Sequence, residues 1–210
     1  MNTIWADRHG VHDALTSRGD LTAWLHSINL TEREPSGGAG GLEPFAGPER
    51  SGGPAGTGRA MRVTSDDLGQ ARGLRDALRL LAAHRTADPR PLASVVVPVP
   101  EDSAADLAAA VAVVNEAAAA RDPARLRLRD GRLERDATPA GPPATAALAA
   151  VATQAIALLT GPDAPPLRAC LAPGCVLYFV QDHPRREWCC TGCGNRARVA
   201  RHYQRHHSKI

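Results

Sequence analysis

The five cysteines of this 210-residue chain all lie in its last fifth, in two groups. Cys170 and Cys175 form the first group, and Cys189, Cys190 and Cys193 form the second, after thirteen intervening residues. Two cysteine pairs on tight turns, joined by a short connection, can place four thiolates around one tetrahedral Zn²⁺. A segment this short has few large apolar residues, so we expect metal binding to supply the folding free energy that a core would otherwise provide.

The spacing predicts one structural Zn²⁺ but leaves one of its ligands open. Four thiolates fill the coordination shell of the ion, whereas a catalytic zinc keeps an open position. Cys190 and Cys193 have the commonest spacing of a zinc knuckle, and Cys189 with Cys193 is also feasible. Adjacent residues cannot both easily point at the ion, so one of them is left as a spare thiol. Buried free cysteines or a redox pair are the alternative to a metal site.

Composition restricts the compartment and the kind of core. The N-terminus has no basic start followed by an apolar stretch, so we expect no signal peptide, no disulfide framework and a reducing cytoplasm. Polar residues such as Thr153 and Gln154 interrupt the alanine-rich segments, so no membrane span is expected. Aromatic residues make up only 3% of the chain, which favours an aliphatic and mainly helical core.

The positive charge of the chain is concentrated beside the cysteines. Residues 168–210 hold eight Lys and Arg against two Asp and Glu, a balance of +6, so the net +3 leaves −3 for the other 167 residues. A basic segment of this kind is typical of a contact with nucleic acid or with an acidic partner. The candidate residues for phosphate contacts are Arg185, Arg186, Arg198, Arg201, Arg205 and Lys209.

The residues after Cys193 predict a helix with two different sides. A helix that begins near Asn195 would place Val199, Ala200 and Tyr203 on one side, where they can pack over the metal site, and arginines on the other. The aromatic residues of the module could stack on bases, but we expect them to form its small core. These residues are Tyr178, Phe179 and Trp188.

Arg196 falls on the apolar side of this predicted helix, where an arginine is unusual. We therefore expect a structural role for it, in a pair with Asp182 or with a backbone carbonyl group.

The N-terminal part of the chain is predicted to be helical, with one hairpin. Helices are expected from near Asp20, from a cap at Thr64 or Ser65, from Ser103, and over residues 142–160. The Asp130-Gly131 pair, between strands that alternate leucine and arginine, predicts a two-residue hairpin. We expect a helical domain over residues 1–160 with a flexible Gly/Pro-rich insert at 34–58, a linker at 161–166, and a zinc module at 167–210. The β-prone run at 93–100 is at best an edge strand, because it contains two prolines.

The motifs of the tail resemble the CGNR zinc-finger family of bacterial proteins. The matching motifs, C-x4-C-x2-YF-x2-D, R-x-WC and CGNRARVARHYQRH, extend over about residues 167–207. The resemblance implies Cys170, Cys175, Cys189 and Cys193 as the zinc ligands, because the family's third ligand directly follows the tryptophan. In that family the finger follows a mainly helical domain, called ABATE, of stress-induced transcription regulators, and the stretches NTIWADRHG and DLTAWL are similar to its start.

The expected fold is therefore mainly α with a small β-hairpin, in which a helical domain precedes a four-cysteine zinc finger of treble-clef or ribbon type that ends in a basic helix. The expected function is zinc-dependent binding of nucleic acid by a transcription regulator whose N-terminal domain senses an unknown small molecule or a partner. Docking on an acidic protein such as part of the transcription machinery, and binding of RNA rather than DNA, are the alternatives. No enzyme is expected, because Asp7, His9, His12 and Asp13 match no catalytic spacing.

Overall fold

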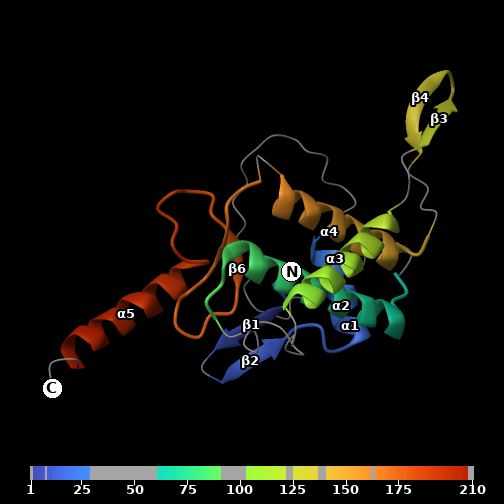
Figure 1. The fold of residues 1–210 in the computed structure, drawn as a ribbon. Helices are drawn as coiled ribbons and strands as arrows, with labels where there is room; N and C mark the ends of the chain where they lie inside the picture. The colour runs from blue at the N-terminus through green and yellow to red at the C-terminus, as the bar shows by residue number, and fades with distance from the viewer. Residues whose placement is uncertain are drawn as a thin grey trace, which may run out of the picture.

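The computed structural model describes residues 2–7, 9–28, 61–90, 103–121, 125–136, 141–161 and 164–207. Helices gather on one side of the molecule, the cysteine-rich segment lies against them, and the last helix projects away (Figure 1). The fold is mainly helical with small hairpins, which confirms the expected class. The predicted insert at 34–58, the β-prone run at 93–100 and Lys209 lie outside the described residues.

Four of the described helices form the N-terminal body around an aliphatic core. They are α1 (Arg18–Ile28), α2 (Ser65–Thr86), α3 (Ser103–Ala119) and α4 (Pro143–Thr160). The core contains mainly leucine and alanine, as the low aromatic content predicted. Its most deeply buried members include Leu15, Leu21, Leu74, Ala144 and Ala152.

Helix α2, with 22 residues, is the longest described helix and connects the body to the cysteine-rich segment. It begins with a capping box, in which the Thr64 hydroxyl accepts from the Asp67 backbone N–H and the Asp67 carboxylate accepts from the Thr64 N–H. Leu74 and Leu78 are buried in the core of the body. Near the end of the helix, Ala82 and Ala83 instead pack against Tyr178 of the cysteine-rich segment. One helix therefore contributes to both parts of the molecule.

Helix α4 bears on the expectation that no segment of the chain spans a membrane. Its 18 residues are long and apolar enough to cross a membrane, and Thr153 and Gln154 do not interrupt it sufficiently to exclude this by composition. A core helix can pass the same test, and one side of α4 is buried in the helical body. The residues buried on that side are Ala144, Leu148, Ala149 and Ala152.

The described residues contain three two-stranded antiparallel sheets, whereas the sequence predicted one hairpin. The predicted one is β3 (Arg125–Arg129) with β4 (Arg132–Asp136), and it turns through Asp130 and Gly131, both at positive φ as a type I′ turn requires. The others are β1 (Ile4–Asp7) with β2 (Gly10–Asp13), and β5 (Leu167–Ala169) with β6 (Tyr178–Val180). Their strands are only three or four residues long, too short for a clear alternating pattern.

The candidate metal centre and the basic helix

The loop between β5 and β6 carries the first two cysteines. Cys170 follows β5 directly, and its N–H donates to the carbonyl of Leu177, 2.9 Å away, which closes the loop. Within the loop, the N–H of Cys175 donates to the carbonyl of Ala172 over 2.9 Å. Gly174 has a φ of +71°, a conformation that glycine adopts without strain. This tight turn brings the two thiols to the same side of the loop.

The second turn comes just before the last helix, α5 (Thr191–His207). Cys189 precedes the helix, and Cys193 lies in its first turn. The sequence placed the helix start near Asn195, so the observed helix begins four residues earlier than expected. The N-terminus of a helix favours negative charge, so this position suits a thiolate ligand.

Four sulfur atoms converge between the two turns. The Sγ atoms of Cys170, Cys175, Cys189 and Cys193 all lie within 4.8 Å of one another. The Cys175–Cys189 pair is 3.8 Å apart and the Cys189–Cys193 pair is 3.4 Å apart. Zn–S bonds of about 2.3 Å in tetrahedral geometry separate two sulfurs by roughly 3.8 Å. The cluster therefore has the ligand type, number and spacing of one structural Zn²⁺ site, as predicted.

Electrostatics within the cluster also favours a cation. Hydrogen bonds from the thiols of Cys175 and Cys189 lower the pKa of Cys170 to about 2. The interaction with Cys170 raises the pKa of Cys189, and burial raises the pKa of Cys193 to about 12. Four thiolates this close repel one another, and a divalent cation supplies the positive charge that lets all of them ionise.

Cys190 does not belong to the group of four. Its sulfur is 4.0 Å from that of Cys189, and its side chain is half-buried beside the cluster. The spacing of the cysteines could not choose between these two neighbours, and the structure brings Cys189 to the other three sulfurs.

The residues of the CGNR motif each have a defined contact, and those of Cys193, Gly194 and Arg196 lie at the metal centre. A Cβ on Gly194 would lie 3.1 Å from Cδ1 of Trp188, so only glycine lets the indole pack closely there. The guanidinium of Arg196 donates to Sγ of Cys193 over 3.0 Å, and Asn195 accepts from Arg198. Arg196 is thus structural, as expected, but its partner is a ligand sulfur rather than Asp182 or a carbonyl group. Hydrogen bonds to ligand sulfurs orient the ligands and stabilise their charge.

The side chain of Arg186 forms its contacts inside the finger. Its guanidinium donates to the Asp182 carboxylate over 2.7 Å and to the carbonyl of Cys189 over 2.8 Å. It also lies over the ring of Phe179, 5.3 Å from the centroid. The sequence included Arg186 among the candidates for phosphate contacts, and these bonds instead give it a role in holding the second turn.

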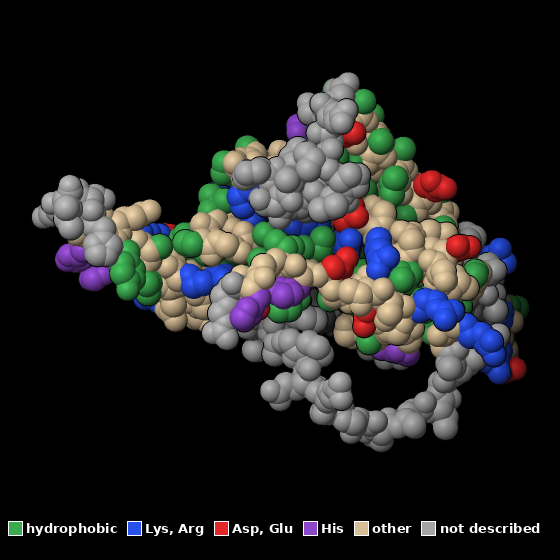
Figure 2. Space-filling view, turned by 90° about the horizontal axis from the view of Figure 1, so that it is seen from below, with side chains coloured by type: hydrophobic (Ala, Val, Ile, Leu, Met, Phe, Trp, Pro, Cys, Tyr) green, Lys and Arg blue, Asp and Glu red, His purple; other side chains and the backbone are tan. Residues whose placement is uncertain are grey.

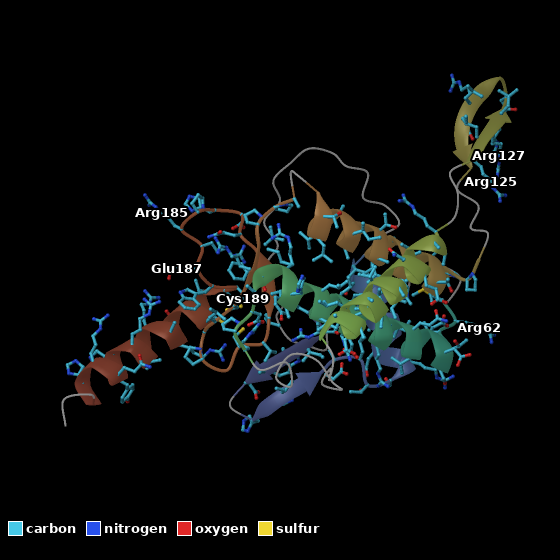
Figure 3. The ribbon with its side chains drawn as sticks, in the orientation of Figure 1. Arg62, Arg125, Arg127, Arg185, Glu187 and Cys189 are labelled. Carbon is cyan, nitrogen blue, oxygen red and sulfur yellow. The ribbon has the colours of Figure 1, made fainter. Side chains whose placement is uncertain are left out.

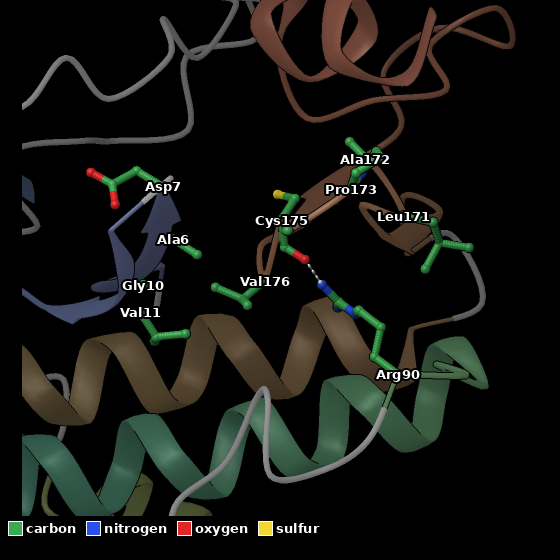
Figure 4. A pocket seen from close by; sticks show the side chains of 11 residues that line it. Ala6, Asp7, Gly10, Val11, Arg90, Leu171, Ala172, Pro173, Cys175 and Val176 are labelled. Carbon is green, nitrogen blue, oxygen red and sulfur yellow. Dashed lines mark hydrogen bonds between the residues drawn. The ribbon is translucent and has the colours of Figure 1, made fainter. Parts of the chain in front are cut away.

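The helical body provides further contacts to the zinc-binding turns. Arg90, which follows α2, donates from Nη1 to the carbonyl of Cys175 over 2.7 Å and lies 3.4 Å from the carbonyl of Cys170 (Figure 4). The other side of its guanidinium pairs with Asp88, whose side chain is 1% exposed. Burial works to raise the pKa of Asp88, but the hydrogen bonds from Arg90 outweigh it, and the pKa is lowered. One ion pair of the body therefore holds the backbone of two zinc ligands.

Tyr178 and its neighbours complete this contact between the body and the finger. The Tyr178 hydroxyl donates to Asp88 over 2.7 Å, and its ring lies beside the guanidinium of Arg90. Arg79 of α2, which is 1% exposed, donates to the carbonyl of Val176 over 2.9 Å. The side-chain amide of Asn2 donates to the Tyr178 carbonyl over 2.7 Å. Sequence reasoning placed Tyr178 in the core of the finger, and the structure places it against the body.

An open cleft of about 450 Å³ lies between the β1–β2 hairpin and the first zinc-binding turn (Figure 4). Asp7 and Arg90 are among its lining residues, and both have partners: Arg90 pairs with Asp88, and Asp7 accepts from His9 and pairs with His12. The remaining lining is mostly small or apolar side chains.

The apolar side predicted for the last helix is only partly correct. Cys193, Gly194 and Ala197 face the finger and are buried. Val199 and Tyr203, which we expected over the metal site, are 55% and 60% exposed. Figure 1 shows the reason: α5 extends beyond the finger, so its second half has no neighbouring helix or strand among the described residues to pack against.

The arginines of α5 and of the preceding loop lie on the surface. Arg198, Arg201 and Arg205 are exposed along the projecting helix, and Arg185 is exposed on the loop (Figure 3). Arg201 also pairs with Glu187 over 3.6 Å. In the space-filling view, basic and histidine side chains follow the projecting arm (Figure 2).

The polar residues at the N-terminus are used within the hairpin and its contact with the body. Asp7 accepts from the ring of His12 over 2.8 Å, and His12 stacks on Trp5. Asp13 accepts from Arg75 of α2 over 2.6 Å and from the backbone N–H of Leu15.

Two cysteine-bearing turns around a tetrahedral site, the second running into a helix, define a structural zinc finger attached to a helical domain. Residues 1–162 match the ABATE family, described as "Putative stress-induced transcription regulator", and residues 167–206 match the CGNR zinc finger. The chain belongs to the ABATE family and ends in a CGNR zinc finger, which confirms the resemblance found in its sequence motifs. No curated protein and no solved structure matches the chain in these comparisons.

Proposed function

We propose that this protein is a zinc-dependent transcription regulator that binds nucleic acid through the exposed arginines of α5. The observation that carries the proposal is the position of Arg198, Arg201 and Arg205 on a helix that begins at the metal centre and extends past the finger. A projecting helix with exposed guanidinium groups can approach a phosphate backbone without obstruction by the described parts of the chain. Arg185 extends this surface, and Arg186 is left out of it because of its internal bonds.

The zinc ion has a structural role in this proposal. It joins the two turns to the first turn of α5, so the helix is presented in a fixed direction. The family description of the N-terminal domain supports a regulatory role, with the helical body as the part that responds to a ligand or partner. A binding function is also favoured over an enzymatic one, because Asp7, His12 and Asp13 are engaged in structural pairs.

The test is a salt titration of nucleic-acid binding by the zinc-loaded chain. The triple variant R198A/R201A/R205A is compared with R62A/R85A/R121A, which removes the same charge from exposed arginines of the helical body. Each lost phosphate contact lowers the slope of log K against log salt by about 0.9 on duplex DNA and about 0.7 on a single strand. We expect a smaller slope and weaker binding for the α5 variant alone. Binding equal to wild type in that variant would refute the proposal, and parallel titrations with duplex DNA and single-stranded RNA identify the preferred ligand.

A second candidate function is docking on a protein, and the exposed Val199 and Tyr203 favour it. They lie four residues apart on one side of α5, next to the arginines, and could contact an acidic partner that has an apolar patch, such as a subunit of the transcription machinery. Nuclease treatment separates the two functions. A purified partner that stays bound after nuclease, and is lost in V199S/Y203S, supports docking, whereas release by nuclease supports nucleic acid.

A further inference from the structure

The β3–β4 hairpin stands apart from the other described helices and strands (Figure 1). Three leucines on it are 77%, 69% and 74% exposed: Leu126, Leu128 and Leu133. Within the described residues, the two strands form hydrogen-bonded ladders only with each other. A two-stranded hairpin is at best marginally stable alone in water, and further strands or a packed face are needed to secure it. The hairpin is therefore a candidate for pairing with another chain.

The register separates the hairpin into a leucine face and a charged face. Residues directly opposite each other share a face, and Leu128 lies opposite Leu133 while Arg127 lies opposite Glu134. At the turn, Arg129 lies opposite Arg132. Among the residues whose side chains the structure describes, the leucine face carries Leu126, Leu128 and Leu133, and the charged face carries Arg125, Arg127, Arg129, Arg132 and Glu134.

The two outer edges differ in whether they can pair with a copy of themselves. Antiparallel pairing of β3 with a second β3, centred on Arg127, would oppose Arg127 to itself and Arg125 to Arg129. Like charges directly opposite are destabilising, so this edge is protected against self-pairing. Figure 3 shows Arg125 and Arg127 on this strand.

The charges on β4 have the opposite effect. Antiparallel pairing of β4 with a second β4, centred on Leu133, places Leu133 opposite Leu133 of the second copy. The same register places Arg132 opposite Glu134 of the second copy, and this pair occurs twice because of the two-fold symmetry. Both pairs have complementary charges, so the side chains favour this register.

The backbone of β4 suits the same register. In a two-residue hairpin, the pair that closes the turn exchanges both backbone hydrogen bonds, and here it is Arg129 with Arg132. Hydrogen-bonded and non-bonded pairs alternate along the ladder, so the N–H and C=O of Leu133 point outward. Two such residues facing each other across a two-fold axis can exchange both of their hydrogen bonds.

We propose that the open edge of β4 binds β4 of a second copy of this chain, to form a four-stranded antiparallel sheet centred on Leu133. The leucines of both copies then lie on one continuous face, and the outer edges are the arginine-protected β3 strands. We expect two hairpins to bury less area than the roughly 1,200 Å² at which stable interfaces begin, so we expect a weak dimer with a dissociation constant in the micromolar range or above. The inference does not depend on nucleic-acid binding by α5.

Sedimentation equilibrium of the full zinc-loaded chain at about 5–200 μM tests the proposal, since this range spans a weak dimer. E134R turns both attractive cross-copy pairs into repulsions, and we expect about 30-fold weaker dimerisation. R132E should weaken it equally, although it improves the pair with Arg129 inside the hairpin. The double variant R132E/E134R restores opposite charges across the axis and should restore dimerisation.

R129E is the matched control, because it makes the same charge change as R132E on the same face but on the strand away from the axis. We expect it to dimerise like wild type. A chain that is monomeric at all these concentrations overturns the proposal. A dimer that E134R leaves unchanged, or one that the double variant fails to restore, also overturns it, because either result would show that β4 does not form the contact.

Discussion

The contact of Arg90 with the zinc-binding turn predicts that a residue of the helical body controls zinc affinity. Arg90 is separated by 80 residues from Cys170 and touches no sulfur, yet its guanidinium holds the carbonyls of two zinc ligands. Arg90→Gln keeps a polar side chain but removes the charged donor and the pairing with Asp88. We expect weaker zinc binding with the ligand set unchanged.

The size of the effect follows from the contacts. A hydrogen bond that involves a charged group contributes about 1.5–3 kcal/mol, which corresponds to roughly 10- to 150-fold in an equilibrium constant. Loss of groups that orient metal ligands typically lowers metal affinity about 10- to 100-fold. The 2.7 Å bond to the carbonyl of Cys175 is direct, so we expect a loss within this range.

Arg90→Gln also leaves Asp88 buried without its cation, which costs about 3–5 kcal/mol of stability. The double variant R90Q/D88N removes that unpaired charge, so it separates the effect on folding from the effect on zinc. It should recover most of the stability but keep the loss of zinc affinity.

Zinc affinity is measured by competition with a chromophoric chelator, with thermal unfolding in parallel. Arg72→Gln is the matched control, because Arg72 of α2 donates to the carbonyls of Leu15 and Thr16 in the helical body, at 2.7 and 2.9 Å. It should lower the stability of the body and leave zinc affinity unchanged. If R90Q/D88N binds zinc within twofold of wild type, the contact does not position the ligands and the reasoning is wrong.

Three further predictions concern the finger and its contact with the body. Gly194→Ala should destabilise the finger by about 1–3 kcal/mol, because the new methyl group would crowd the indole of Trp188. Gly73→Ala is the matched control in α2: a Cβ at this position would have no atom within 4 Å, so the substitution should raise the melting temperature. Cys190→Ser should keep one zinc per chain by elemental analysis, since its sulfur lies outside the cluster of four. The pKa of Asp88 is lower in the folded state than in the unfolded state, so the ionised carboxylate stabilises the fold at pH values above the unfolded pKa of about 4. This stabilisation is lost as the pH falls through the folded-state pKa. The difference in unfolding free energy between wild type and Asp88→Asn should therefore be constant above about pH 5 and shrink below about pH 4.

The misplaced features of α5 show where local patterns fail. Helical periodicity correctly separated the arginines from Val199 and Tyr203, but it could not tell how far the finger extends along the helix. The early start at Thr191 follows from the metal site, since Cys193 reaches the other sulfurs from the first turn of the helix. The same limit applies to Arg196, because its partner is a sulfur that only the folded finger brings within 3.0 Å.

The sequence by itself determined the elements whose causes are local. The capping box at Thr64, the turn at Asp130 and Gly131, and the four-sulfur zinc site all follow from residue types at short spacing. Only the tertiary structure decided that Arg90, which follows α2, supports the backbone of the zinc ligands, and it confirmed Cys189, which the family resemblance implied but the cysteine spacing left open against Cys190. The physical reason is that these contacts join residues far apart in the chain, or distinguish neighbours by direction alone, and spacing carries no information about either.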